Sequence, residues 1–151
     1  MNDLDLIVTR RMAVAPARVW RCWTEPKLIE LWFAPKPVIV RDVVVDLWAG
    51  GAFSSTMILP DGTEIQNLGA LLVVEPERRL VFTDCLGPDF RPKDNPFFSA
   101  EVLIEPDGDG TLYTARAIHG SAATRDKHAE MGFHQGWGTV AAQLEALAAS
   151  L

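Results

Sequence analysis

The stretch Asp46-Leu-Trp-Ala-Gly-Gly-Ala-Phe53 decides the fold, together with the turn Pro60-Asp-Gly-Thr63 that follows it. One alternating run of apolar residues ends at Gly50-Gly51, and a second leads from there to the Pro-Asp-Gly turn. Glycine adopts the positive-φ or bulged backbone that a sharp bend between two strands requires. Proline presets one turn dihedral, and the glycine takes the permissive position. This region therefore predicts an antiparallel meander that continues into a third strand through Gly69.

Working outward from the meander, period-two alternation and turn residues predict seven strands. Their ranges are 4–14, 38–48, 52–59, 64–75, 79–86, 97–106 and 111–119. Two short helices are expected after the first strand, beginning at Pro16 and Pro26, because proline is favoured in the first turn of a helix. The segment Gly87–Pro96 contains three prolines and is too long for a hairpin turn. It is either a lid or binding loop, or a surface excursion.

A long amphipathic helix is predicted over 125–149, with Thr124 as its N-cap. Its apolar stripe consists of Phe133, Trp137, Val140, Leu144, Leu147, Ala148 and Leu151. The sheet is the only surface large enough to bury that stripe. Gly132, Gly136 and Gly138 lie inside this range, and each costs up to about 1 kcal/mol relative to alanine in a helix interior. We therefore expect close backbone packing, or a need for space beside Trp137.

Composition and charge restrict the class of protein. A chain of 151 residues with 48% hydrophobic and 23% charged residues is expected to form one globular domain, residues 1–151. The net charge of −6 argues against nucleic-acid binding and against an anionic membrane surface. Cys22 and Cys85 stand alone and are expected to be reduced thiols. Without a signal peptide or a long apolar run, the expected location is cytoplasmic.

The order of strand, two short helices, six strands and long helix resembles the helix-grip architecture of the START and birch-pollen-allergen-like (SRPBCC) superfamily. Within it, the chain is similar to the Aha-type family, the homologues of the heat-shock-chaperone ATPase activator. The matching residues are Ala15-Pro-Ala-Arg-Val-Trp20, Trp32-Phe33, Asp46–Gly51, Pro60–Gly62, Gly69, Pro76, Leu80–Phe82 and Gly136-Trp137. The resemblance implies an α+β helix-grip fold, in which a curved seven-stranded antiparallel sheet wraps around the C-terminal helix and leaves a cavity between them.

Family resemblance does not decide the function. Such proteins include ligand carriers, cyclase- and hydrolase-like enzymes, and the C-terminal domain of the chaperone activator. The first strand begins within a few residues of Met1, which leaves no room for the domain that precedes this one in the activator. A chaperone-interaction module is therefore the less favoured alternative, and a small cyclase, dehydratase or hydrolase is another.

The sequence offers little for catalysis or metal binding. His119, His128 and His134 fall within sixteen residues, but the last two lie about 240° apart around a helix and form no metal-binding pair. We therefore expect no metal and no cofactor. No GxSxG motif marks a nucleophile. Asp84 is in phase with Leu80 and could face inward as an acid or base, or could lie solvated at a strand end.

The favoured hypothesis is a non-covalent binder of a small apolar or amphipathic ligand rather than an enzyme. Such a protein needs only a shaped apolar space and one or two polar anchors. The candidate cavity residues are Trp20, Met57, Phe82, Phe98, Tyr113, His119, Glu130, Phe133, His134 and Trp137. Tyr113 and His119 are expected on one strand face. The expected partners are that ligand and, in a homodimer, a second copy of the chain, with no nucleic acid and no membrane.

Overall fold

The computed structural model describes residues 2–151 and contains the predicted order of the seven main strands and two short helices. It differs in the last helix and in the segment before the sixth main strand, where a short two-stranded sheet forms. The main elements are β1 (Asp5–Met12), α1 (Pro16–Thr24), α2 (Pro26–Trp32), β2 (Ile39–Val45), β3 (Ala52–Ile58), β4 (Glu64–Glu75), β5 (Arg79–Thr83), β8 (Ser99–Asp107), β9 (Gly110–Ile118), α3 (Ala122–Glu130) and α4 (Phe133–Ala149). The segment before β8 holds β6 (Leu86–Gly87), a 3₁₀ turn (Pro88–Phe90) and β7 (Arg91–Pro92). No helix in the described part of the chain is long and apolar enough to cross a membrane.

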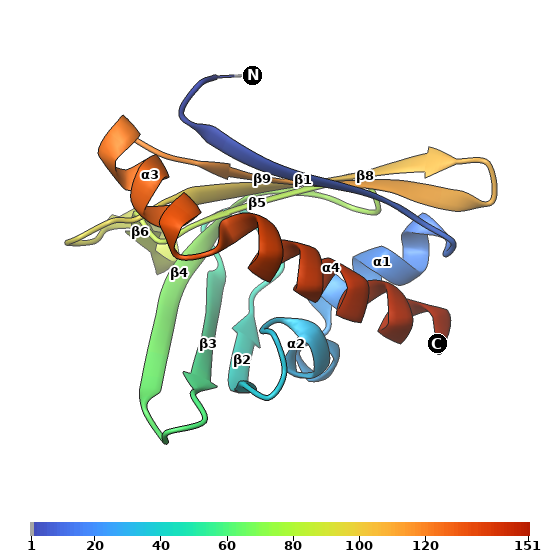
Figure 1. The fold of residues 1–151 in the computed structure, drawn as a ribbon, viewed down its shortest axis with the longest axis horizontal. Helices are drawn as coiled ribbons and strands as arrows, with labels where there is room; N and C mark the ends of the chain where they lie inside the picture. The colour runs from blue at the N-terminus through green and yellow to red at the C-terminus, as the bar shows by residue number, and fades with distance from the viewer. Residues whose placement is uncertain (1) are drawn as a thin grey trace.

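The seven main strands form one antiparallel sheet in the order β1-β9-β8-β5-β4-β3-β2. The first half of β4 pairs with β3 and its second half with β5, so the sheet bends along this strand. Figure 1 shows β2, β3 and β4 descending from the rest of the sheet, while α4 crosses the concave side. At the bend, a Cβ on Gly69 would lie 2.3 Å from the carbonyl oxygen of Thr83. The predicted α+β helix-grip fold is confirmed.

The bend before β3 forms where the glycine pair predicts it. Gly50 has a φ of +86°, and its N–H donates to the carbonyl oxygen of Leu71 over 2.8 Å. A Cβ on Gly51 would lie 2.0 Å from the carbonyl oxygen of Asp46, so no larger residue fits this position. The two glycines therefore join β2 and β3 while fastening the bend to β4.

The prediction of one helix over 125–149 is wrong, because the chain breaks between α3 and α4. Gly132 has a φ of +90°, a left-handed conformation that ends α3 and precedes the first turn of α4. The N-cap of α3 is Ser121, whose Oγ accepts the N–H of Thr124 over 3.2 Å, so Thr124 is not the cap. Of the two explanations for the glycines, close packing is wrong, because a Cβ on Gly132, Gly136 or Gly138 would meet nothing within 4 Å. The alternative, space beside Trp137, agrees with the open pocket that Gly132, Gly136 and Trp137 line.

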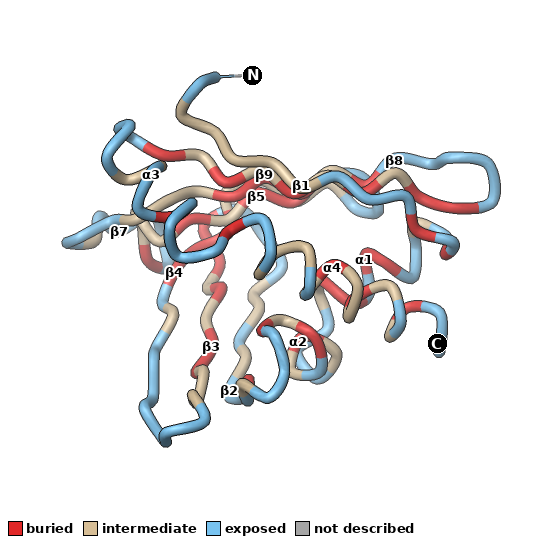
Figure 2. The backbone as a smooth tube through the Cα atoms, viewed as in Figure 1, coloured by how far each residue is buried: buried red, intermediate tan, exposed pale blue. Residues whose placement is uncertain are grey.

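The C-terminal half of α4 is held by apolar contacts with the core on one side and by hydrogen bonds of Gln143 on the other. Ala141, Leu144 and Ala148 are buried in the core beneath the strands, and Figure 2 shows buried positions of α1 and α4 gathered there. Gln143 Nε2 donates to the carbonyl oxygens of Trp32 and Ala34, over 3.0 Å and 2.8 Å. These contacts fasten the helix to the segment after α2 and leave its N-terminal half beside the open part of the sheet.

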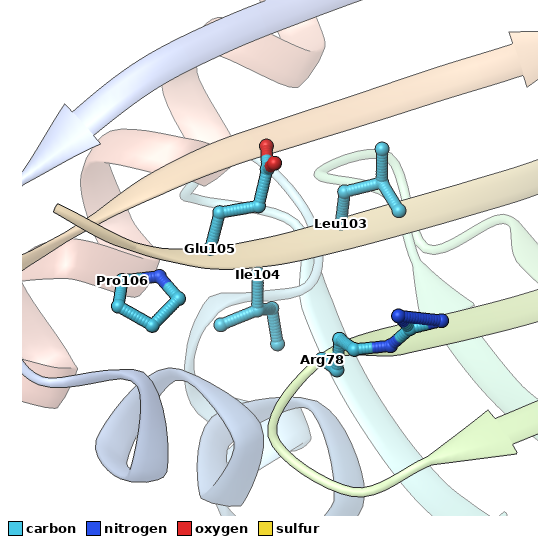
Figure 3. A pocket seen from close by; sticks show the side chains of 5 residues that line it. All are labelled: Arg78, Leu103, Ile104, Glu105 and Pro106. Atoms are coloured by element: carbon cyan, nitrogen blue, oxygen red, sulfur yellow. The ribbon is translucent and has the colours of Figure 1, made fainter.

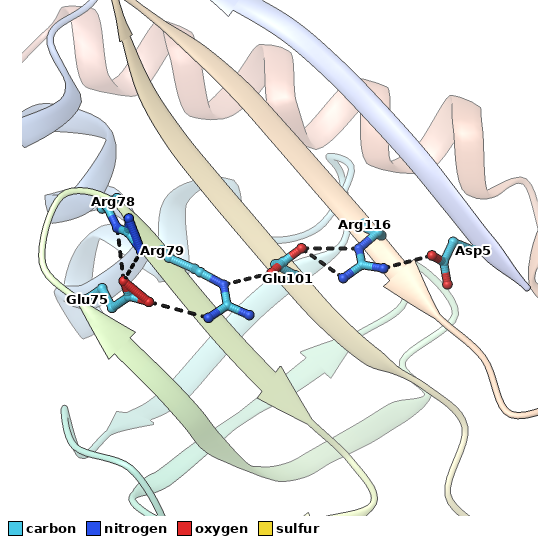
Figure 4. Close-up of polar contacts among 6 residues, drawn as sticks. All are labelled: Asp5, Glu75, Arg78, Arg79, Glu101 and Arg116. Carbon is cyan, nitrogen blue, oxygen red and sulfur yellow. Dashed lines mark hydrogen bonds and ion pairs between the residues drawn. The ribbon is translucent and has the colours of Figure 1, made fainter. Parts of the chain in front are cut away.

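The opposite face of the sheet carries charge. Arg116 bridges Asp5 and Glu101 over 2.8 Å and 3.0 Å, and Glu101 also accepts from Arg79 over 2.7 Å. Figure 4 shows this chain of side chains on the face turned away from α4. Burial alone would raise the pKa of Glu101, but the hydrogen bonds from the two arginines outweigh it and lower the pKa. Because these charges pair with one another, the network is structural and leaves no free charged group there for a ligand.

Candidate ligand-binding pocket

An open pocket of about 670 Å³ lies on the concave side, where β3 and the first half of β4 diverge from the N-terminal half of α4. The segment after α2 and the loop before β8 complete its wall. Its aromatic wall residues are Trp23, Trp32, Phe33, Phe53, Phe82, Phe97, Phe98, Tyr113, Phe133 and Trp137. Sites for small molecules commonly enclose about 300–1,000 Å³ behind mostly apolar walls. This pocket has the size and lining of such a site.

The aromatic side chains form a continuous row rather than isolated contacts. The ring centroids of Trp23 and Phe82 lie 5.7 Å apart, and those of Phe82 and Phe98 lie 6.4 Å apart. Trp137 continues the row 5.7 Å from Phe98 and 4.7 Å from Phe133. Aromatic pairs at these separations pack favourably. The row holds the wall in one shape and presents apolar ring surface to the pocket.

The structure brings six of the ten candidate residues to the pocket wall. These are Met57, Phe82, Phe98, Tyr113, Phe133 and Trp137. Trp20, His119, Glu130 and His134 do not line it. Trp20 is buried in the core, and Trp23, one helical turn later, takes the wall position instead. Glu130 and His134 are exposed on either side of the break at Gly132, and the break turns both away from the pocket.

Tyr113 places a hydroxyl group in the apolar wall. The indole N–H of Trp23 donates to the Tyr113 oxygen over 3.2 Å. Burial raises the pKa of Tyr113 far above its ordinary value, so the side chain stays a neutral phenol. Among residues 2–151, no acceptor takes the proton of this hydroxyl group, which leaves a hydrogen-bond donor in the wall.

Asp84 does face the pocket, but its carboxylate is already occupied. One oxygen accepts the backbone N–H groups of Phe97 and Phe98, over 2.9 Å and 3.1 Å, and the other accepts from Phe97 over 3.1 Å. The side chain therefore holds two aromatic wall residues in place. Both interpretations of Asp84 are therefore replaced. The side chain is neither solvated at a strand end nor free to act as an acid or base, because both of its oxygens accept backbone N–H groups.

A histidine pair lies behind the wall formed by Phe97 and Phe98. His119 Nδ1 lies 2.8 Å from the carbonyl oxygen of Leu4, and His119 Nε2 lies 2.8 Å from Nδ1 of His128. Both side chains are buried, but only His128 lines the pocket. Burial, as the larger cause, and the neighbouring charge of His119 together lower the pKa of His128 to about 4. His128 is therefore neutral near neutral pH.

His128 is the polar site residue that the sequence analysis missed. A single helix over 125–149 gave no reason to point it at the sheet. The left-handed Gly132 changes the helix direction, and the rings of His128 and Phe133 then meet with centroids 5.2 Å apart. The signal available in the sequence was Gly132 itself, because glycine commonly ends a helix in the left-handed conformation.

A smaller hollow of about 370 Å³ lies elsewhere on the sheet, between the end of β8 and the turn before β5. Figure 3 shows its five lining side chains, among which Arg78 and Glu105 are the charged ones. Arg78 is already paired with Glu75 over 2.5 Å. This hollow gathers no aromatic wall and no free polar group at depth, so we place the candidate site in the larger pocket. Residues 2–151 contain no group of three or more His, Cys, Asp and Glu side chains that could hold a metal ion.

Comparison with known proteins agrees with this architecture. The family model described as Activator of Hsp90 ATPase homolog 1-like protein (AHSA1) matches residues 13–149. The chain therefore belongs to this family, which is part of the SRPBCC superfamily.

Solved structures carry the same fold. A crystal structure from Nitrosomonas europaea is 42% identical in sequence with a TM-score of 0.95, and the match covers 97% of this chain and 96% of that one. A Mycobacterium smegmatis structure is 25% identical with a TM-score of 0.80, covering 95% and 90%. A Silicibacter pomeroyi protein named AHSA1, 21% identical over 94% and 95% with a TM-score of 0.70, shows the shared fold alone. No curated protein matches the chain.

Proposed function

We propose that this protein binds a small apolar or amphipathic molecule in the pocket between α4 and the bent sheet. The observation that carries the proposal is the open pocket of about 670 Å³ walled by a continuous row of aromatic rings. Burying a flat apolar molecule against such a wall is favourable by roughly 25 cal/mol per Å² of apolar surface removed from water. Membership of the SRPBCC superfamily supports a ligand-binding or related role.

The polar groups of the pocket favour an amphipathic ligand. The mouth of the pocket is part apolar and part polar. Its apolar part includes the exposed side chains of Ile65, Leu68 and Met131. Lys93 lies at the same mouth and donates to the carbonyl oxygen of Leu68. A ligand with its apolar body against the aromatic row and a polar end near Lys93 would satisfy both regions.

Catalysis is supported less well than binding. A cyclase, dehydratase or hydrolase needs convergent groups that are free to exchange protons. The Asp84 carboxylate is committed to the backbone of Phe97 and Phe98, and the Tyr113 oxygen accepts from Trp23. Neither group is free to act as a base, and the low pKa of His128 makes its imidazole a weak base. A chaperone-interaction role rests on the family alone.

The test is binding of the fluorescent probe 1-anilinonaphthalene-8-sulfonate to a matched pair of variants. Gly136 lines the pocket and Gly138 does not, and both lie in α4 with open space where a side chain would begin. Gly136→Leu is expected to weaken probe binding at least about tenfold, or 1.4 kcal/mol, because the new side chain occupies the pocket. Gly138→Leu is expected to bind like the wild type. Equal effects of the two substitutions would contradict the proposed site.

A further inference from the structure

The carbonyl group of Leu4 determines which ring nitrogens of His119 and His128 carry protons. The carbonyl oxygen of Leu4 only accepts hydrogen bonds, so His119 Nδ1, 2.8 Å away, carries a proton and donates it. In a neutral His119 the other nitrogen, Nε2, is then bare and acts as an acceptor. Its partner at 2.8 Å is His128 Nδ1, which must therefore be the protonated nitrogen of His128. The chain of donors runs from His128 through His119 to Leu4.

This arrangement leaves Nε2 of His128 without a proton. No protein group in residues 2–151 donates to that nitrogen. The same part of the chain contains no fully buried side-chain nitrogen or oxygen that lacks a partner, so this nitrogen is reachable from outside the protein. Because the imidazole ring lines the pocket and only 6% of the residue is exposed, the accessible side of the ring is the pocket side.

The ring cannot easily turn away from this orientation. Its centroid lies 4.9 Å from the ring of Phe97, 4.9 Å from Phe98 and 5.9 Å from Trp137. The hydrogen bond to His119 fixes the remaining rotation. His119 is thus a positioning residue, which acts on the pocket only through His128.

We propose that Nε2 of His128 is a fixed hydrogen-bond acceptor for the ligand, so that the pocket selects apolar molecules carrying a hydroxyl donor, such as a phenol, over their O-methylated counterparts. This inference rests on the proposed function and adds the class of ligand. A methoxy group in the same place would set two acceptors against each other and leave the nitrogen unpaired, which carries a desolvation cost.

The charges around His128 are compatible with a neutral acceptor. His119 faces it directly, and Lys127 of the same helix lies with its Nζ 5.9 Å from the centre of the Phe97 ring. His119 is the neutral acceptor in this arrangement, and the positive charge of Lys127 opposes protonation of His128. The carboxylate of Asp84 also lines the pocket, where it accepts the backbone N–H groups of Phe97 and Phe98. The low pKa of His128 agrees with this environment.

The first test needs no ligand. Long-range ¹H–¹⁵N spectra of the full chain near neutral pH distinguish a protonated ring nitrogen from a bare one. The expected result for His128 is a protonated Nδ1 and a bare Nε2. A protonated Nε2 would overturn the inference and leave the proposed binding function untouched.

The second test compares 2-naphthol with 2-methoxynaphthalene, followed by quenching of tryptophan fluorescence. The two probes share one apolar body, and only 2-naphthol donates a hydrogen bond. We expect the wild type to bind 2-naphthol about three- to tenfold more tightly, as one hydrogen bond allows. His128→Phe keeps an aromatic ring and is expected to bind both probes equally, while the exposed-site control His134→Phe retains the preference.

The outcomes distinguish the preference for a hydroxyl donor from the existence of the apolar pocket. Equal affinity of the wild type for both probes would overturn the hydroxyl preference but support the apolar pocket. Binding of neither probe would overturn both. A preference that survives in His128→Phe would assign the donor contact to another group and overturn the role of His128.

Discussion

The indole N–H of Trp23 donates to the hydroxyl oxygen of Tyr113 over 3.2 Å, which joins α1 to β9 at the wall of the pocket. Both side chains are buried, and no other protein group in residues 2–151 accepts from this indole. The pair therefore couples the stability of the fold to the shape of the pocket.

Replacing Tyr113 with phenylalanine is expected to lower the free energy of unfolding by about 1–3 kcal/mol, because the Trp23 N–H then stays buried without an acceptor. The ring itself remains, so no large cavity opens. Chemical denaturation of the wild type and the variant measures the difference. The double variant Trp23→Phe with Tyr113→Phe should lose less than the sum of the two single variants, since no orphaned donor is left; strictly additive losses would contradict a direct interaction.

The three glycines near the helix break should respond to alanine in opposite directions. Gly136→Ala and Gly138→Ala are each expected to stabilise the fold by up to about 1 kcal/mol, because alanine is the better helix former and nothing obstructs its Cβ. Gly132→Ala is expected to destabilise by about 1–2 kcal/mol, because its φ of +90° disfavours any residue with a Cβ. Thermal unfolding of the three variants checks both signs. Stabilisation by Gly132→Ala would mean that α3 and α4 form one helix in solution.

Gln143 is expected to stabilise the pocket wall after α2, although its own side chain does not line the pocket. Its side chain donates to the carbonyl oxygens of Trp32 and Ala34 and accepts the N–H of Lys36 over 3.1 Å. Gln143→Leu is expected to cost about 1–3 kcal/mol through the unpaired backbone groups. It should also speed amide hydrogen exchange at Phe33 and Ala34, which line the pocket, and at Lys36 beside them. Gln135→Leu, an exposed position of the same helix, is the control and should change neither quantity.

Much of the fold could be predicted because its turns are marked by residues with few conformational options. Gly50-Gly51 and the Pro60–Gly62 turn fix the meander, and Pro16 and Pro26 mark the starts of the two short helices. The break at Gly132 escaped prediction for a physical reason. A glycine inside a run of helical period is consistent both with a weakened helix and with a left-handed terminus, and only tertiary contacts decide between them.

The apolar wall could be predicted from strand phase, whereas its polar group could not. Met57, Phe82 and Tyr113 alternate with outward-facing neighbours, so their side of the sheet follows from the pattern. The orientation of His128 depends on the angle between α3 and α4 and on a carbonyl group more than a hundred residues away in the sequence, at Leu4. No local pattern carries that information.

The low pKa of His128 predicts a dependence of stability on pH. In the folded protein this pKa is about 4, against an ordinary value of 6.5. As the pH falls through this interval, the unfolded chain takes up a proton that the folded protein refuses, so the free energy of unfolding decreases. The contribution is fully present above the ordinary value and is lost toward pH 4, with a total of up to about 3 kcal/mol.

The measurement is chemical denaturation of the wild type, His128→Phe and His134→Phe between about pH 5 and pH 7. Carboxylates with lowered pKa values, such as Glu145, which accepts the N–H of Ala13 and pairs with Arg10, lose their contribution as the pH falls below this window. The difference in stability between wild type and His128→Phe therefore isolates the histidine. We expect His128→Phe to flatten the decrease and His134→Phe to retain it. If both variants lose stability with falling pH as steeply as the wild type, His128 accepts a proton as readily in the folded chain as in the unfolded one, and the neutral acceptor in the pocket wall would have to be abandoned.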